Sequence, residues 1–92
     1  MERDQIRGVL KTIFETETGD QILSLKDGVI LAQDFELDSV DMVSLIMRVE
    51  GHFRVRMTYS ELEEVATVGQ LIDLVQAKVA EVAIAPPARR AA

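Results

Sequence analysis

The chain contains no cysteine, and this single absence excludes several kinds of chemistry. Disulfides, thiolate catalysis and cysteine-based metal sites are all impossible without that residue. Histidine is almost as scarce, because His52 is the only one in the sequence. One imidazole does not make a metal site by itself. We therefore expect no metal bound by this protein alone.

Aromatic residues are also few, at 4% of the chain with no tryptophan, whereas hydrophobic residues make up 48%. The core must therefore be built from aliphatic side chains. With 92 residues the chain has room for one domain. A domain of this size buries a limited share of its surface and is only marginally stable.

Long apolar runs are missing as well, since none reaches the roughly 18 residues that a membrane span requires. The first residues, Met1 to Asp4, carry charges of both signs and lack the apolar region of a signal peptide. We expect a cytoplasmic protein. The net charge is −6, which argues against nucleic-acid binding. An acidic balance suits partners with basic docking surfaces, or serves solubility alone.

Apolar residues recur at helical spacing in three stretches, which predicts three substantial helices. The first covers residues 4–16 with Asp4 as its cap, the second runs from Ser39 to Phe53, and the third is capped by Thr67. A short helix is expected at residues 60–65, where Ser60 and a following glutamate form a capping box. The expected buried residues are Ile6, Val9, Leu10, Ile13, Phe14, Val43, Leu45, Ile46, Val49, Phe53, Val68, Leu71, Ile72, Val75 and Val79.

The segment between the first two helices, residues 19–38, allows two interpretations. Its apolar runs flank Asp27-Gly28, which is a turn signal for a small hairpin. Alternatively the segment is a long loop anchored on the helices by Leu31 and Phe35. We favour the loop, because an isolated hairpin is weak.

The sum predicts an all-α four-helix bundle with three longer helices, one short helix and a long first loop. Its domain should span residues 1–83. Residues 84–92 form a tail of Pro, Ala and Arg with no core-forming pattern, which we expect to be disordered.

The run Asp38-Ser39-Val40-Asp41 places a hydroxyl at the first turn of the second helix. Ser39 there is either a helix N-cap or a group held out for modification, and the two roles are compatible. A serine hydrolase would need a base, but His52 lies 13 residues later, about 20 Å along a straight helix. The nearby acids lack the glycine and glutamate of a calcium loop. The chain thus offers a reactive position without the parts for its own catalysis.

The residues from Leu31 to Phe53 read L-x-x-D-F-x-L-D-S-V-D-x-V-x-L-I-M-x-V-E-x-x-F. This pattern resembles the acyl carrier protein family. The resemblance extends from residue 4 to residue 80, through Ile6, Leu10 and Ile13 before it and Leu62, Thr67 and Ile72 after it. Chain length and helix order agree with it.

The resemblance implies a non-catalytic carrier whose Ser39 receives 4′-phosphopantetheine from coenzyme A through a phosphopantetheinyl transferase. The thiol of the arm would carry acyl groups as thioesters. Asp38 matches the family's acid before the serine. The residues that match positions facing partner enzymes are Val40, Asp41, Met47 and Glu50. Those partners would be acyl-activating, acyltransferase or ketosynthase enzymes. The carrier itself is expected to be a monomer.

Several departures from the family pattern refine this expectation. Glu36 stands where the family often has glycine, and the Gly-Gly pair of peptidyl carriers is absent, which favours an acyl over an aminoacyl cargo. An unmodified interaction module remains an alternative. The second helix is less acidic than in general fatty-acid carriers, since Ser44 and Gly51 replace acids and positive residues are added at Arg48, His52, Arg54 and Arg56. We expect a specialised fatty-acid, polyketide or lipid pathway with weaker docking to housekeeping enzymes.

The aliphatic core raises one further hypothesis, that an acyl chain shelters between the second helix and the short helix. The residues concerned are Val43, Ile46, Leu62, Val65 and Ala66. Ordinary core packing explains the same residues equally well.

Overall fold

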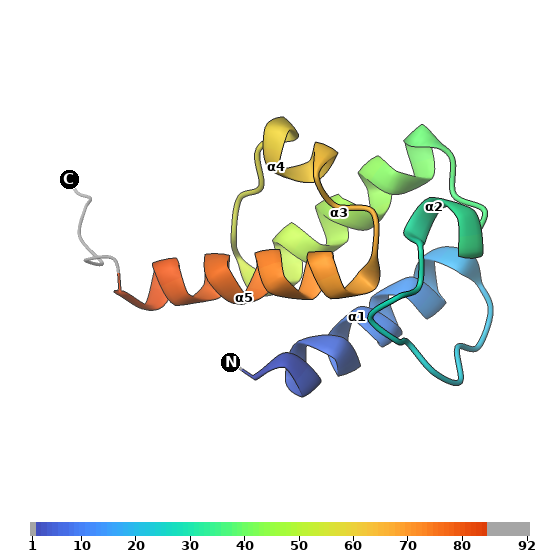
Figure 1. Cartoon of the computed structure of the whole chain (residues 1–92), viewed down its shortest axis with the longest axis horizontal. Coiled ribbons are helices and arrows are strands. Elements are labelled where there is room, and N and C mark those ends of the chain that lie inside the picture. The colour runs from blue at the N-terminus through green and yellow to red at the C-terminus, as the bar shows by residue number, and fades with distance from the viewer. Residues whose placement is uncertain (1, 85–92) are drawn as a thin grey trace.

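The computed structural model describes residues 2–84 and the side chains of residues 2–81. Five helices follow one another: α1 (Arg3–Thr18), α2 (Leu31–Asp34), α3 (Ser39–Phe53), α4 (Tyr59–Glu63) and α5 (Val68–Ile84). In Figure 1, α3 and α5 both run opposite to α1, while α2 and α4 are short and lie at the edge of the bundle. The all-α prediction is confirmed, with no strand among the described residues and one more short helix than expected.

The long helices form where the apolar spacing predicts them, but their caps differ in detail. α1 is capped by Glu2, which exchanges hydrogen bonds with the first turn in a capping box with Gln5, so Asp4 is not the cap. The prediction for α5 is confirmed, because the Thr67 hydroxyl oxygen accepts from the Gln70 N–H at 3.2 Å and the Gln70 side chain accepts from the Thr67 N–H.

The cap of α4 lies two residues before its predicted position. Thr58, not Ser60, accepts from the Glu61 N–H at 3.1 Å, and the Glu61 carboxylate accepts from the Thr58 N–H at 2.8 Å. No residue of α4 is fully buried. An ion pair between Lys78 and Glu61, at 2.7 Å, ties this short helix to α5. α4 is therefore held by few contacts compared with the three long helices.

The segment of residues 19–30 is a loop, as favoured above, and the hairpin alternative is wrong. Its only pairing of β type is an isolated antiparallel bridge between Ile30 and Thr67. Leu31 is buried, and Phe35 packs edge-on against Phe14 with ring centroids 5.3 Å apart, so both predicted anchors are confirmed. The unexpected feature is that Leu31 begins a four-residue helix, α2.

Backbone hydrogen bonds fasten this loop to the start of α5. The carbonyls of Asp27 and Val29 accept from the N–H groups of Gly69 and Val68 at 2.9 Å each. The first N–H groups of a helix lack partners within it, so the loop satisfies donors that would otherwise be orphaned. At Gly69 the approach is so close that a Cβ would lie 2.9 Å from the Asp27 Cβ.

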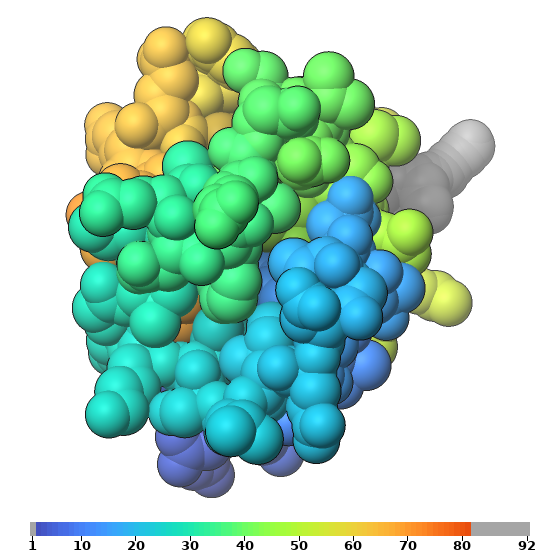
Figure 2. Space-filling view, turned by 90° about the vertical axis from the view of Figure 1, so that its right-hand side faces the viewer, coloured from blue at the N-terminus to red at the C-terminus, as the bar shows by residue number. Residues whose placement is uncertain are grey.

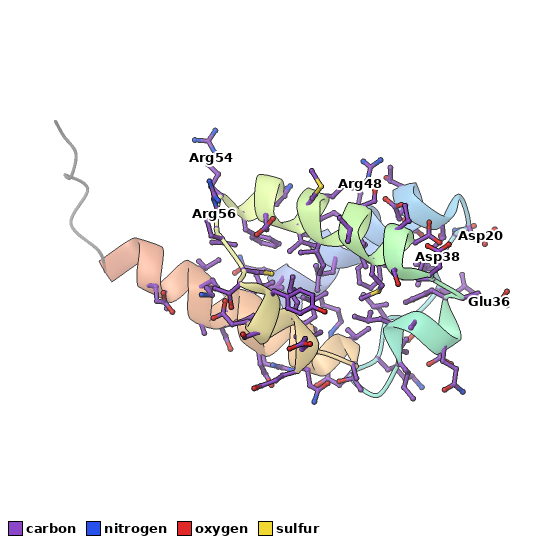
Figure 3. All side chains as sticks on the ribbon, turned by 90° about the horizontal axis from the view of Figure 1, so that it is seen from above. Asp20, Glu36, Asp38, Arg48, Arg54 and Arg56 are labelled. Atoms are coloured by element: carbon purple, nitrogen blue, oxygen red, sulfur yellow. The ribbon has the colours of Figure 1, made fainter. Side chains whose placement is uncertain are left out.

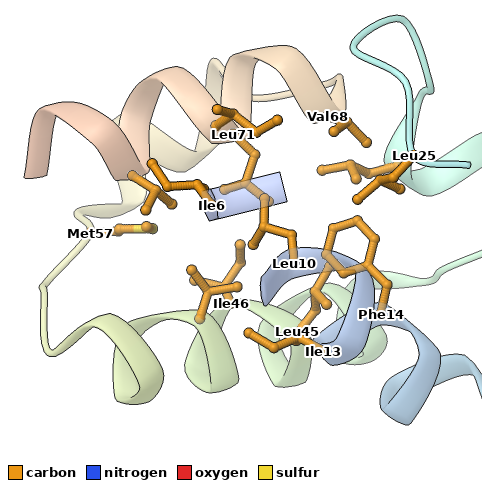
Figure 4. Packing of buried hydrophobic residues seen from close by; sticks show 14 of the residues in the cluster. Ile6, Leu10, Ile13, Phe14, Leu25, Leu45, Ile46, Met57, Val68 and Leu71 are labelled. Atoms are coloured by element: carbon orange, nitrogen blue, oxygen red, sulfur yellow. The ribbon is translucent and has the colours of Figure 1, made fainter. Parts of the chain in front are cut away.

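The core lies between α1, α3 and α5 and is aliphatic apart from Phe14 (Figure 4). No polar or charged side chain is buried among those described. Val43 was expected in this core but is 59% exposed, which corrects the prediction. Ile84 is the last residue of α5, and the rest of the predicted tail, residues 85–92, lies outside the described part. The buried residues are Ile6, Leu10, Ile13, Phe14, Ile22, Leu25, Leu31, Leu45, Ile46, Val49, Val55, Met57, Val68, Leu71, Ile72 and Val75.

Candidate functional site

The start of α3 is organised by a reciprocal pair of acids on either side of Ser39. The Asp38 carboxylate accepts from the Asp41 N–H at 2.8 Å, and the Asp41 carboxylate accepts from the Asp38 N–H at 3.3 Å. Asp38 is therefore the N-cap, and Ser39 is the first residue inside the helix. The possibility that Ser39 itself caps α3 is not realised, so its hydroxyl has no structural task at the helix end.

The turn before this cap sets the direction in which α3 begins. Glu36 has a φ of +54°, in the left-handed region, and the Leu37 N–H donates to the Ala32 carbonyl at 2.9 Å. This is the arrangement that commonly ends helices with a glycine, here completed by a glutamate after α2. Glu36, a non-glycine residue, thus holds a left-handed backbone conformation that costs about 1 kcal/mol.

The Ser39 side chain is exposed, and no described residue hydrogen-bonds to its hydroxyl. No described acceptor takes the N–H groups of Ser39 and Val40 either, the two amides next to that hydroxyl. These amides carry the positive end of the α3 dipole, which favours an anion at this place. Figure 2 shows this end of the molecule, where the start of α3 and the segment before it form the surface. The geometry suits a hydroxyl that is esterified by an anionic group.

A catalytic pair with the single histidine is ruled out by position. His52 lies in the last turn of the α3 helix that Ser39 begins, with its ring edge-on to Phe53 at 5.0 Å between centroids. The 13 residues from Ser39 to His52 along a straight helix separate the two by about 20 Å. Within the described residues, no group of three or more histidine or carboxylate side chains is arranged to hold a metal ion.

The four predicted partner-facing residues fall into two kinds. Val40 and Met47 are 75% and 64% exposed, and they stand free on the outer face of α3. Asp41 and Glu50 are half-buried and already bound, Asp41 in the capping pair and Glu50 by accepting from the Met57 N–H at 2.8 Å.

Val43 belongs with the exposed residues, although the sequence analysis assigned it to the core. It lies three residues after Val40 and four before Met47, so the three share one face of the helix. That spacing was the signal that could have revealed it. The exposed apolar ridge of α3 thus consists of Val40, Val43 and Met47.

A groove lies on each side of this ridge, and both grooves begin at Ser39. The first, about 620 Å³, is lined by Ser39, Val40, Val43, Ser44, Met47 and Arg48. The second, about 420 Å³, lies between α3 and α4 and includes the predicted acyl-shelter residues Val43, Ile46, Leu62 and Val65. Ala66, the fifth of those residues, is exposed and does not line it.

None of the described helices combines the length and apolar character needed to cross a membrane. What the fold and site define is a small helical domain in which an exposed serine, whose hydroxyl has no described hydrogen-bond partner, begins a long helix.

Comparison with known proteins identifies that class. Residues 8–75 match the family described as "Phosphopantetheine attachment site". The chain is 29% identical over 76 residues to the acyl carrier protein of Thermotoga maritima, covering 83% of this chain and 94% of the relative. It is 28% identical over 88 residues to the acyl carrier protein of Saccharopolyspora erythraea, covering 96% of this chain and 93% of the relative.

The fold agrees with these sequence relatives. The crystal structure of the Thermotoga maritima acyl carrier protein superposes with a TM-score of 0.79 at 26% identity, covering 89% of this chain and 95% of that one. The solution structure of the holo acyl carrier protein of Geobacter metallireducens gives 0.78 at 25% identity, covering 90% and 95%. The chain belongs to the acyl carrier protein family. Its prosthetic group is 4′-phosphopantetheine.

Proposed function

We propose that Ser39 is the residue that carries the phosphopantetheine and that the chain shuttles acyl groups between enzymes. The observation that supports this most directly is that Asp38 caps α3 and the Ser39 hydroxyl is left exposed. The free amides of Ser39 and Val40 would supply hydrogen-bond donors for an oxygen of the phosphodiester. When attached, the arm supplies a thiol that the cysteine-free chain lacks, and that thiol holds the acyl group as a thioester.

Modification is tested by incubating the chain with coenzyme A and a promiscuous phosphopantetheinyl transferase and measuring its mass. We expect the mass to rise by one arm. Ser39→Ala should abolish the gain, whereas Ser44→Ala should retain it, because Ser44 donates to the Glu17 carboxylate at 3.1 Å instead of standing free. An unchanged mass beside a transferase that modifies another carrier would favour an unmodified interaction module.

In this proposal the chain catalyses nothing and works as a cytoplasmic monomer. Its partners are the transferase and acyl-activating, acyltransferase or ketosynthase enzymes. Val40 and Met47 would contact them directly, since both side chains are exposed. Asp41 and Glu50 would contribute only the oxygens that their backbone hydrogen bonds leave free. Asp38 would serve the transferase as well as the helix.

The cargo is proposed to be an acyl group of a specialised fatty-acid, polyketide or lipid pathway, with the aminoacyl carrier as the less favoured alternative. The support is the weak acidity of α3, where Glu50 is the one acid after Asp41 and its carboxylate is engaged by Met57. Housekeeping fatty-acid acyltransferase and ketosynthase should therefore use the loaded chain with a lower kcat/KM than their own carrier. Equal kcat/KM values would remove the argument.

We also propose that the acyl chain enters the groove between α3 and α4. The lining is apolar apart from its rim, and α4 has no fully buried residue to resist a small displacement. Methyl signals of Val43, Ile46, Leu62 and Val65 should shift in proportion to acyl length in NMR spectra of the loaded protein. Val75, buried in the main core, provides the control. Length-independent spectra would indicate ordinary packing alone.

A further inference from the structure

The cations of α3 and its following loop are unevenly distributed and partly unpaired. Among the described arginines, Arg3, Arg7 and Arg48 are each paired with an acid, at Asp27, Asp27 and Glu17. Arg54 and Arg56 are exposed, and no described residue forms an ion pair or hydrogen bond with the guanidinium group of either. Two cations two residues apart repel each other, and the dipole of α3 favours only the one at its end.

Arg54 also occupies a backbone position that suits glycine better. It ends α3 with a φ of +57°, and the following Val55 N–H donates to the Glu50 carbonyl at 3.1 Å, as in a glycine-terminated helix. A residue in an unfavourable conformation whose side chain gains no hydrogen bond or ion pair within the described fold breaks a local rule without evident compensation. Such positions are where function outside the fold is expected.

Exposed acids lie at the opposite end of α3, near Ser39. Figure 3 shows Glu36, Asp38 and Asp20 near the start of α3, and Arg54 and Arg56 at its far end. The helix spans about 20 Å between these groups. The apolar ridge of Val40, Val43 and Met47 lies between them, and Arg54 follows Met47 by seven residues, so its backbone lies at the end of the same side of the helix. The charge of the face therefore changes along its length. It is acidic near Ser39, mainly apolar in the middle, where Arg48 is paired with Glu17, and basic at its end.

We propose that this face docks onto an enzyme whose surface is acidic where the end of α3 meets it. The inference rests on the carrier function proposed above and specifies the chemistry of the partner. An apolar depression on the enzyme would receive the ridge, and carboxylates about 20 Å from its entrance would pair with Arg54 and Arg56. The charge gradient then permits one orientation, with Ser39 at the active-site entrance. An anionic membrane is the disfavoured occupant, because Glu36, Asp38 and Asp41 at the other end of the same face would repel it.

The test measures affinity for a matched pair of ketosynthases. One has a basic docking surface, and the other is the same enzyme with the basic residues opposite the end of α3 changed to glutamate. Binding is followed by calorimetry, and ¹⁵N NMR shifts locate it on α3. The unmodified chain is used, so the result does not depend on whether Ser39 is loaded. Loading is measured separately by mass, which keeps a failure of the proposed function distinct from a failure of this inference.

We expect tighter binding to the acidic version, weakened by added salt. Arg54→Glu/Arg56→Glu should weaken that binding about tenfold and reverse the preference between the two enzymes. Lys11→Glu/Lys26→Glu changes the net charge equally on another part of the molecule and should have little effect. Arg54→Gly should raise the midpoint of thermal unfolding while still weakening the binding, which separates docking from folding.

Two results would overturn the inference. The first is equal or tighter binding to the basic enzyme. The second is Arg54-dependent binding of the chain to phosphatidylglycerol vesicles but not to phosphatidylcholine vesicles, which would assign the face to a membrane surface.

Discussion

At the scale of single residues, Asp38 has one observed role and one proposed role, which can be separated by substitution. It caps α3 through the Asp41 N–H, and the family resemblance gives it a part in loading Ser39. Asp38→Ser keeps a capping oxygen and removes the charge, so thermal stability should be nearly unchanged while the rate of phosphopantetheine loading falls. Asp38→Ala should also lose about 1 kcal/mol of unfolding free energy. If Asp38→Ser loads at the wild-type rate, the acid acts only as a cap.

Glu36 provides a second residue-scale prediction. Because its φ is +54°, Glu36→Gly should raise the free energy of unfolding by about 1 kcal/mol, measured by urea denaturation. Glu36→Ala, which removes the same charge but keeps a side chain, should give no such gain. Equal stabilisation by both substitutions would mean that charge, not backbone conformation, is unfavourable at this position.

At the scale of elements, Asp27 joins three parts of the bundle. Its carboxylate pairs with Arg7 and Arg3 at 2.6 Å each, and Arg3 also pairs with Asp73 of α5. The hydrogen bond from Arg7, followed by that from Arg3, holds the pKa of Asp27 below its ordinary value. These ion pairs among Arg3, Arg7, Asp27 and Asp73, called the clasp below, thus link α1, the first loop and α5.

The lowered pKa of Asp27 predicts a specific pH dependence. A carboxyl group with a depressed folded-state pKa stabilises the fold above its unfolded pKa, and this contribution is lost as the pH falls through the folded-state value. The difference in unfolding midpoint between wild type and Asp27→Asn should be full at neutral pH and shrink below about pH 4. Asp20→Asn, at an exposed residue outside the clasp, is the control. A difference independent of pH would contradict the electrostatic explanation.

Gly69 lies at the contact between the first loop and α5, whereas Gly8 lies in open space on α1, so the two glycines allow a matched comparison. Gly69→Ala would bring a Cβ within 3.2 Å of the Asp27 carbonyl oxygen, so it should destabilise the protein by about 1–3 kcal/mol. Gly8→Ala, within α1 and with nothing within 4 Å, should stabilise it by up to about 1 kcal/mol. Denaturant titration of both variants measures the difference. Stabilisation by both would show that the loop moves away from α5 easily.

At the scale of the whole molecule, stability depends on one small aliphatic core. Leu71→Ala, at a residue with 0% exposure, should cost about 2–5 kcal/mol, a large share of the total for a domain of this size. Calorimetry should show the melting temperature reduced by about 10 °C or more. Leu23→Ala removes the same atoms from a side chain that is 88% exposed and should leave the melting temperature nearly unchanged. A similar effect of both would indicate that Leu23 is covered in solution.

The sequence by itself determined the three long helices, the aliphatic core and the place of Ser39 at the start of α3. These are local properties, since apolar spacing and capping residues act within a few positions of one another. The local signals fail where two of them compete. Thr58 and Ser60 each precede a glutamate by three residues, so the spacing fits either as the cap, and in the structure the cap is Thr58.

Only the tertiary structure decided the rest. α2 is too short for any periodicity and forms because the loop around it bonds to α5, more than thirty residues later along the chain. The spacing of Val43 fits both burial with Ile46 and exposure with Val40 and Met47, and α4 leaves that edge of α3 uncovered. The ion-pair partners of the arginines also depend on residues distant in the sequence. Arg3 and Arg7 meet Asp27 across the bundle, while Arg54 and Arg56 meet no described acid, because charge partners are set by how the helices pack.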